Sequence, residues 1–204
     1  MRTLFLAGAT ALVLVSAFAI PADAAYITTL EEVGNDVIAT GSGSLDLMGL
    51  TFQNTATTSA LIQPDRAFLV LGLVFTGVEV YRGISGPSSF GSGNTVITAL
   101  VGSGTTVGIE GAAPGVIAVP VGYVSGTDLG TTIVIWENAT FGSLGVMPGT
   151  YVWSWGTGAT ADTYTLQIGA TDSVPEPASL VLLSLGLLGT GTARWIRRRR
   201  LQSM

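Results

Sequence analysis

Hydrophobic and polar residues alternate with a period of two along most of the middle of the chain. The alternating runs are short, and Gly, Ser, Thr and Pro separate them. Alternation of this kind puts successive side chains on opposite faces of a strand, so each run predicts a half-buried β-strand. The predicted strands are residues 37–40, 45–47, 67–75, 78–81, 95–101, 106–110, 116–124, 131–136, 151–155 and 163–168.

The spacing of these runs predicts the fold class. They recur at about 8–12 residues, which is typical of β-sandwiches. No stretch between residues 25 and 173 shows a convincing stripe of period 3.6, the pattern of an amphipathic helix. We therefore expect an all-β domain, built as an antiparallel β-sandwich with jelly-roll or Greek-key-like connections.

Four segments carry more detailed expectations. Residues 26–36 form a polar lead-in, and residues 37–47 predict a hairpin around the Gly-Ser-Gly-Ser turn at 41–44. The nearly continuous apolar run 67–75 predicts a central strand. Pro120 interrupts the run 116–124, and proline cannot donate to a ladder, so this run predicts an edge strand or a bend.

The N-terminal 24 residues have the three parts of a secretory signal. Arg2 supplies the positive region, an apolar stretch follows, and Ala22-Asp23-Ala24 is an A-x-A cleavage site. Small residues at Ala22, Ala24 and Ala25 favour cleavage before Ala25 over an uncleaved signal anchor. The sequence thus predicts a signal helix in residues 1–24, passage through the Sec translocon, and a mature chain that starts at Ala25.

The C-terminal 31 residues predict a second membrane element. Pro175 and Pro177 fix their own φ angles and favour extended geometry in the residues before them. Residues 178–196 are mainly apolar, and a helix of this length spans about 28 Å, close to the hydrocarbon core of a bilayer. The basic tail 194–204 stays cytoplasmic by the positive-inside rule. The chain then divides into residues 1–24, an exported domain 25–173, and a tail 174–204.

The tail resembles a known family signal in the order and spacing of its parts. Its turn 174–180, apolar helix and arginine run are similar to the PEP-CTERM sorting signal. That resemblance implies processing by exosortase, a membrane cysteine transpeptidase of Gram-negative bacteria that make exopolysaccharide and biofilm. It also implies a sorting and processing site at Val174, Pro175, Glu176, Pro177, Ala178 and Ser179. The basic residues that stop transfer are Arg194, Arg197, Arg198, Arg199 and Arg200.

Composition excludes several classes of chemistry. The chain has no His, no Cys and no Lys. Ser-His-Asp and Cys-His catalysis, His- or Cys-bound zinc and a disulfide framework are therefore impossible. Residues 25–173 contain eleven acidic side chains against two arginines, a formal charge of −9. Because binding to phosphates needs cations, we expect no nucleic-acid partner.

Three functional roles remain possible for the acidic and aromatic residues, and each role has a structural alternative. Some of the eleven acids could form a glycosidase pair, although a solvated acidic surface is the simpler interpretation. Aspartates beside turns could bind calcium; they are Asp36, Asp46, Asp128, Asp162 and Asp172. Tyr151, Trp153 and Trp155 share one strand face, either as a sugar-stacking platform or, as we favour, as core residues.

These observations predict an exported, non-catalytic protein of the bacterial cell surface or extracellular matrix. The precursor is held in the inner membrane with its domain in the periplasm, and the mature form reaches the outer envelope or matrix. We expect no catalytic residue, no metal and no cofactor. The alternative is an extracellular carbohydrate-binding module, with exopolysaccharide as its partner.

Overall fold

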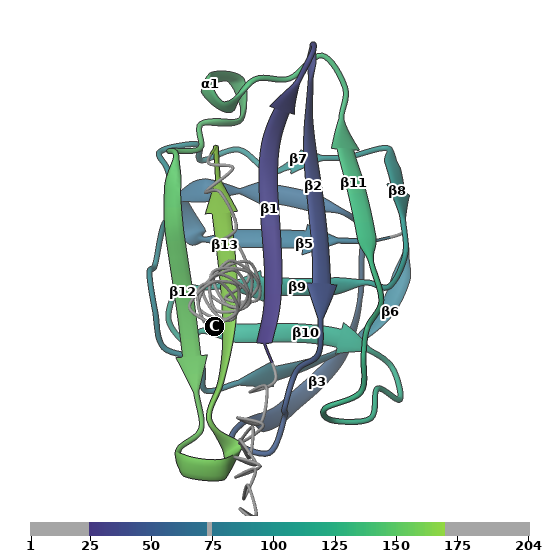
Figure 1. The fold of residues 1–204 in the computed structure, drawn as a ribbon, viewed down its shortest axis with the longest axis vertical. Coiled ribbons are helices and arrows are strands. Elements are labelled where there is room, and N and C mark those ends of the chain that lie inside the picture. The colour runs from purple at the N-terminus through teal and green to yellow at the C-terminus, as the bar shows by residue number, and fades with distance from the viewer. Residues whose placement is uncertain (1–24, 73–74, 170–204) are drawn as a thin grey trace, which may run out of the picture.

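The computed structural model describes residues 25–72 and 75–169, and β-strands make up most of them (Figure 1). Six strands form one sheet, in the order β12-β13-β1-β2-β11-β8. Their bounds are Gly149–Trp155 for β12, Asp162–Ile168 for β13, Ala25–Val33 for β1, Asp36–Gly43 for β2, Thr132–Trp136 for β11 and Val101–Ser103 for β8.

A second sheet contains seven strands in the order β3-β6-β10-β9-β5-β4-β7. Their bounds are Thr51–Thr58 for β3, Thr76–Arg82 for β6, Val116–Pro120 for β10, Val107–Glu110 for β9, Phe68–Leu71 for β5, Leu61–Gln63 for β4 and Ile97–Thr98 for β7. The helical elements are the short α1 (Phe141–Leu144) and the 3₁₀ turns η1 (Pro64–Arg66) and η2 (Gly158–Thr160).

The two sheets lie face to face, and the strands of one run across those of the other (Figure 1). Crossed strands are one of the two usual ways in which sheets pack. One cluster of buried side chains from both sheets fills the space between them. Within the described ranges, no helix is long and apolar enough to cross a bilayer. The predicted signal helix 1–24 and membrane helix 178–196 lie outside these residues.

Strand β1 lies inside the first sheet, so the expectation of a polar lead-in at residues 26–36 is wrong. It pairs with β13 on one side and β2 on the other. Tyr26, Thr28 and Leu30 are fully buried on its inner face. Threonine in this pattern was read as polar, but the Thr28 hydroxyl lies 2.8 Å from the Tyr164 hydroxyl and shares a hydrogen bond with it. That bond removes most of the penalty of burying the hydroxyl.

The pairing of β1 with β13 is parallel, from Ala25 opposite Thr163 to Leu30 opposite Ile168. The other pairings among the described strands are antiparallel. The all-β prediction is confirmed, whereas the purely antiparallel arrangement is wrong at this pair. The parallel pair arises because the first and last strands of the domain are neighbours.

The predicted hairpin at residues 37–47 is also wrong. Strand β2 continues to Gly43, and the hairpin turn lies instead between β1 and β2, where Gly34 has a φ of +66°. Gly41 lies within β2 for a packing reason. A Cβ there would lie 2.6 Å from the Tyr26 hydroxyl oxygen and 2.7 Å from Leu71 Cδ1. Gly41 therefore permits close contact between the two sheets, and the turn is formed elsewhere.

The second sheet combines confirmed and corrected predictions. The strand expected at 67–75 is present as β5, inside the sheet. The run 116–124 gives β10, which lies between β6 and β9 and ends at Pro120, so the bend is correct and the edge position is wrong. The segment 95–101 divides between the sheets, β7 in one and the start of β8 in the other. The Thr-rich segment 51–58, for which no strand was predicted, is the edge strand β3.

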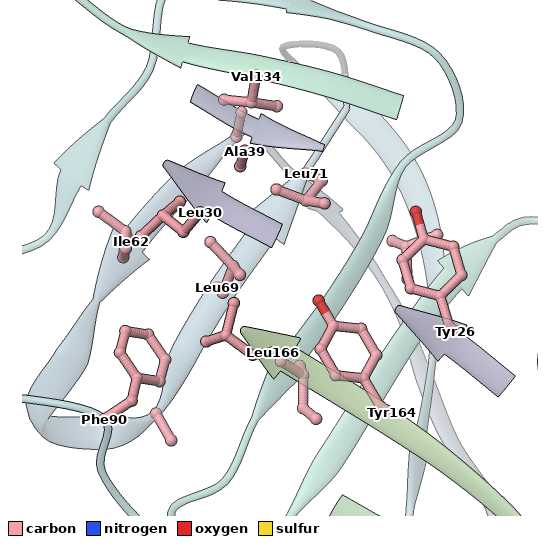
Figure 2. Packing of buried hydrophobic residues seen from close by; sticks show 14 of the residues in the cluster. Tyr26, Leu30, Ala39, Ile62, Leu69, Leu71, Phe90, Val134, Tyr164 and Leu166 are labelled. Carbon is pink, nitrogen blue, oxygen red and sulfur yellow. The ribbon is translucent and has the colours of Figure 1, made fainter. Parts of the chain in front are cut away.

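The centre of the core is aromatic on the side of the first sheet. The rings of Tyr26 and Tyr164 stack with centroids 5.5 Å apart, and Leu166 lies beside them (Figure 2). Leu69 and Leu71 of β5 approach from the second sheet (Figure 2). All five side chains are fully buried. Without a disulfide in the chain, burial of this kind must stabilise the fold.

Candidate functional site

The last strand of the domain leads directly towards the predicted sorting segment. Strand β13 lies between β12 and β1, and the Gly169 N–H that follows it donates to the Leu30 carbonyl at 2.9 Å. The position at which the chain leaves the domain is therefore fixed to the sheet. The predicted sorting residues 174–179, and the arginines at 194 and 197–200, lie outside the described residues.

The connection between domain and sorting segment is short. Four residues, 170–173, separate Gly169 from Val174. An extended chain advances at most about 3.3–3.6 Å per residue, so the two Cα atoms can be no more than about 18 Å apart. An enzyme that processes the segment 174–179 must therefore work close to the domain surface.

The first residue that the structure describes, Ala25, is also the first residue after the predicted signal cleavage position. Strand β1 starts at Ala25, which pairs with Thr163, and the Ala25 carbonyl accepts a hydrogen bond from the Ser44 N–H at 3.3 Å. Ala22 and Ala24 lie outside the described residues. Cleavage before Ala25 would thus leave all of the described sheet in the mature chain.

The aromatic residues of β12 belong to the core. Trp153 is fully buried and Trp155 is 5% exposed. The Trp153 indole N–H donates to the Pro87 carbonyl at 2.8 Å, and the Trp155 indole N–H donates to the Asp46 carbonyl at 2.6 Å. Tyr151 is partly buried and packs edge-on against Phe90. The core interpretation is confirmed, and the sugar-stacking platform is wrong because no ring face of these tryptophans is open to a ligand.

Two aspartates fix the loop that follows β2 to the ends of distant strands. The Asp162 carboxylate accepts hydrogen bonds from the Asp46 N–H and the Thr163 N–H, each at 2.6 Å. The Asp46 carboxylate accepts from the Met48 N–H at 2.8 Å and from the Ser125 hydroxyl at 2.9 Å. Both aspartates are among the calcium ligands considered from the sequence, and the hydrogen bond between Asp46 and Ser125 was not predicted. Their geometry is that of a structural clasp, since they bind main-chain donors.

The carboxylates of two other candidate calcium ligands also accept hydrogen bonds from main-chain N–H groups. The Asp36 carboxylate accepts from the Asn138 N–H, and the Asp128 carboxylate accepts from the Gly130 N–H, both at 2.9 Å. Asp172 lies outside the described residues. In the part of the chain that the structure describes, no three acidic side chains come together as a metal site would require. The calcium alternative therefore has no ligand cluster there.

Two hollows open on the described surface, and each contains one acidic residue. The larger, about 320 Å³, lies between the end of β11 and α1 and is lined by Trp136, Glu137 and Leu144 among others. The smaller, about 230 Å³, is an apolar depression on the second sheet that contains Glu110. Glu110 forms an ion pair with Arg66. A carboxylate pair of the glycosidase type needs two acids facing one cleft, and neither hollow supplies that pair.

The order of the parts along this chain is therefore the main indication of its function. An all-β domain is followed, after a few residues, by a Pro-Glu-Pro segment and a basic C terminus. The family model described as the PEP-CTERM protein-sorting motif matches residues 173–200. The chain therefore carries a PEP-CTERM sorting motif, and it is an exported protein processed at a membrane with an exosortase as the processing partner. No curated protein and no solved structure matches the chain.

Proposed function

We propose that this protein is a non-catalytic component of the bacterial cell surface or extracellular matrix. In this proposal the Sec translocon exports it, and the signal peptide is removed before Ala25. The C-terminal helix 178–196 then holds the precursor in the inner membrane with the domain in the periplasm. Exosortase processes the segment 174–179 and releases the domain to the outer envelope or to a matrix that contains exopolysaccharide.

The match of the sorting motif to residues 173–200 is the observation that carries this proposal. Two features of the domain support it. The described strands run from Ala25 to Ile168, so cleavage before Ala25 and processing at 174–179 would leave all of them intact. The acidic side chains at the domain end, Asp46 and Asp162, bind main-chain N–H groups, which is a structural use. Any contact with exopolysaccharide must use groups other than Trp153 and Trp155.

Replacing both Pro175 and Pro177 with alanine is expected to stop processing. The prolines hold the segment extended, as an enzyme cleft reads a peptide, and alanine lets the following helix extend into it. We expect the larger precursor to rise from a minor form to most of the protein, and to stay in the membrane fraction. Fractionation and immunoblotting in the native host, with and without its exosortase gene, measure both quantities.

Ser184→Ala in the apolar stretch is the matched control, since it changes the tail and leaves residues 174–179 intact. It should be processed like the unchanged chain. Normal release of the double alanine variant, or release that continues without exosortase, would show that this tail is an ordinary membrane anchor.

A further inference from the structure

The four edge strands of the described sheets differ greatly in how far they are protected from pairing with another strand. Edges present unpaired N–H and C=O groups, and proteins shorten or cover them to prevent association. Strand β7 has two residues and β8 has three. The edge of β12 is covered by residues 85–90, because Ser85 and Ser154 exchange two main-chain hydrogen bonds of 2.9 Å and the Met147 N–H, just before the strand, donates to the Phe90 carbonyl at 2.9 Å. Three edges are thus closed to a partner strand.

Strand β3 is the exception. It has eight residues at one end of the second sheet (Figure 1), and the seven from Thr51 to Thr57 are exposed. Its pairing is with β6 alone, and within the described residues its main chain makes no hydrogen bond on the other side. A bulge lies at Gln53, so residues 54–58 form the regular part of the edge. This strand can accept another strand.

The side chains of β3 favour a copy of the same strand as that partner. Its sequence, Thr-Phe-Gln-Asn-Thr-Ala-Thr-Thr, contains no charge and no proline. In an antiparallel pair of two such strands every residue faces a neutral residue, and Thr–Thr pairs are favourable. Elsewhere two copies repel, because the described residues contain ten acids against two arginines. The neutral edge is where two acidic domains can approach most easily.

We propose that two copies of this chain associate through β3, which joins their second sheets into one continuous antiparallel sheet. A two-fold pair of this kind is closed, because each copy uses its one long open edge. The sorting segment is a poor occupant of the same edge, since Pro175 and Pro177 lack the N–H groups that a ladder requires. The proposal is independent of where the protein is sorted.

The absence of cysteine gives a direct test. A single cysteine introduced into the full chain can form a disulfide only with another copy. We would place it in turn at Asn54, Thr55, Ala56 and Thr57, extract the chain in mild detergent and add a mild oxidant. A disulfide needs Cα atoms about 5.5 Å apart, so cross-linking should peak at the one or two positions nearest the two-fold axis. Thr150→Cys on the covered edge β12 is the matched control and should give at least tenfold less.

Charged substitutions on β3 provide a second test of the proposed pair. Adding a lysine substitution at the β3 residue next to the best cysteine places the two new charges about two residues apart across the pair, and should lower cross-linking at least tenfold. A glutamate at the same position should do the same alone, and an equal mixture of the lysine and glutamate variants should regain cross-linking. Circular dichroism checks that each variant is folded. A purified chain that sediments as a monomer at tens of micromolar, or cross-linking that is equal at β3 and at Thr150, would overturn the proposal.

Discussion

Replacing Trp153 with alanine is expected to lower the free energy of unfolding by about 3–5 kcal/mol, the usual range for removing a fully buried tryptophan. The indole packs edge-on against Tyr164 with centroids 5.9 Å apart and donates to the Pro87 carbonyl. Two glycines make room for it: a Cβ at Gly86 would lie 2.6 Å from its Cδ1, and one at Gly111 would lie 2.5 Å from its Nε1. Alanine therefore leaves a cavity and an unpaired carbonyl together.

Urea unfolding of the mature domain, followed by circular dichroism, measures this loss. Val152→Ala is the matched control, because Val152 is the next residue on the same strand, faces outward and is 45% exposed. It should change the free energy of unfolding by less than about 1 kcal/mol. Equal effects at the two positions would mean that β12 does not bury Trp153 as described here.

The second large effect is a loss of stability in alkali. Burial raises the pKa of Tyr26 from 10.0 to about 12 and raises the pKa of Tyr164 as well. Above pH 10 the unfolded chain therefore loses phenolic protons that the folded chain keeps, so the free energy of unfolding falls as pH rises. Below pH 10 this contribution is complete. Between pH 10 and 12, Tyr26 alone should remove about 2–3 kcal/mol.

Few other groups titrate in this pH range, because the chain has no His, Cys or Lys. Apart from the terminal amine, tyrosines are the groups that titrate between pH 8 and 12. Urea unfolding at pH 9, 10, 11 and 12 gives the slope. The Tyr26→Phe variant should have a shallower slope. A free energy of unfolding that stays constant from pH 10 to 12, or an unchanged slope in the Phe variant, would contradict the buried state of these rings.

Sequence analysis succeeded where one physical signal dominated. Residues 131–136 are β-branched, and they form β11; residues 163–168 form β13 with Tyr164, Leu166 and Ile168 buried. The interpretation of Trp153 as a core residue was also correct. For β13 and Trp153 the outward neighbours are too small or too polar to fill an interior, so the burial of the large side chains followed from the alternation alone.

Two of the failures involve threonine. Strands β1 and β3 both contain it, and neither was predicted as a strand. In β1 the Thr28 hydroxyl is buried because Tyr164, 136 positions away in the sequence, supplies its partner. In β3 threonine is exposed on an edge, where no alternation of burial arises. Neither circumstance is visible in local sequence, because each depends on which strand lies alongside.

The candidate sites were likewise predicted only where the signal is local in the sequence. The clasp of Asp46, Asp162 and Ser125 joins residues up to 116 positions apart, so no local pattern indicates that the acids bind main-chain donors. The sorting motif, in contrast, is read from consecutive residues, and the match to residues 173–200 confirms it. A sorting motif consists of consecutive residues, so the sequence alone can identify it. A site assembled by the fold brings distant residues together, so the sequence alone cannot.

Export through the signal peptide and processing at the C-terminal motif should leave a mature chain with two new ends. Intact-mass spectrometry of the protein released by the native host tests this most directly, because it reads both ends of the mature chain. The account predicts a chain that begins at Ala25 and ends within or next to residues 174–179, without the arginines at 197–200. A released chain that still ends at Met204 would contradict it.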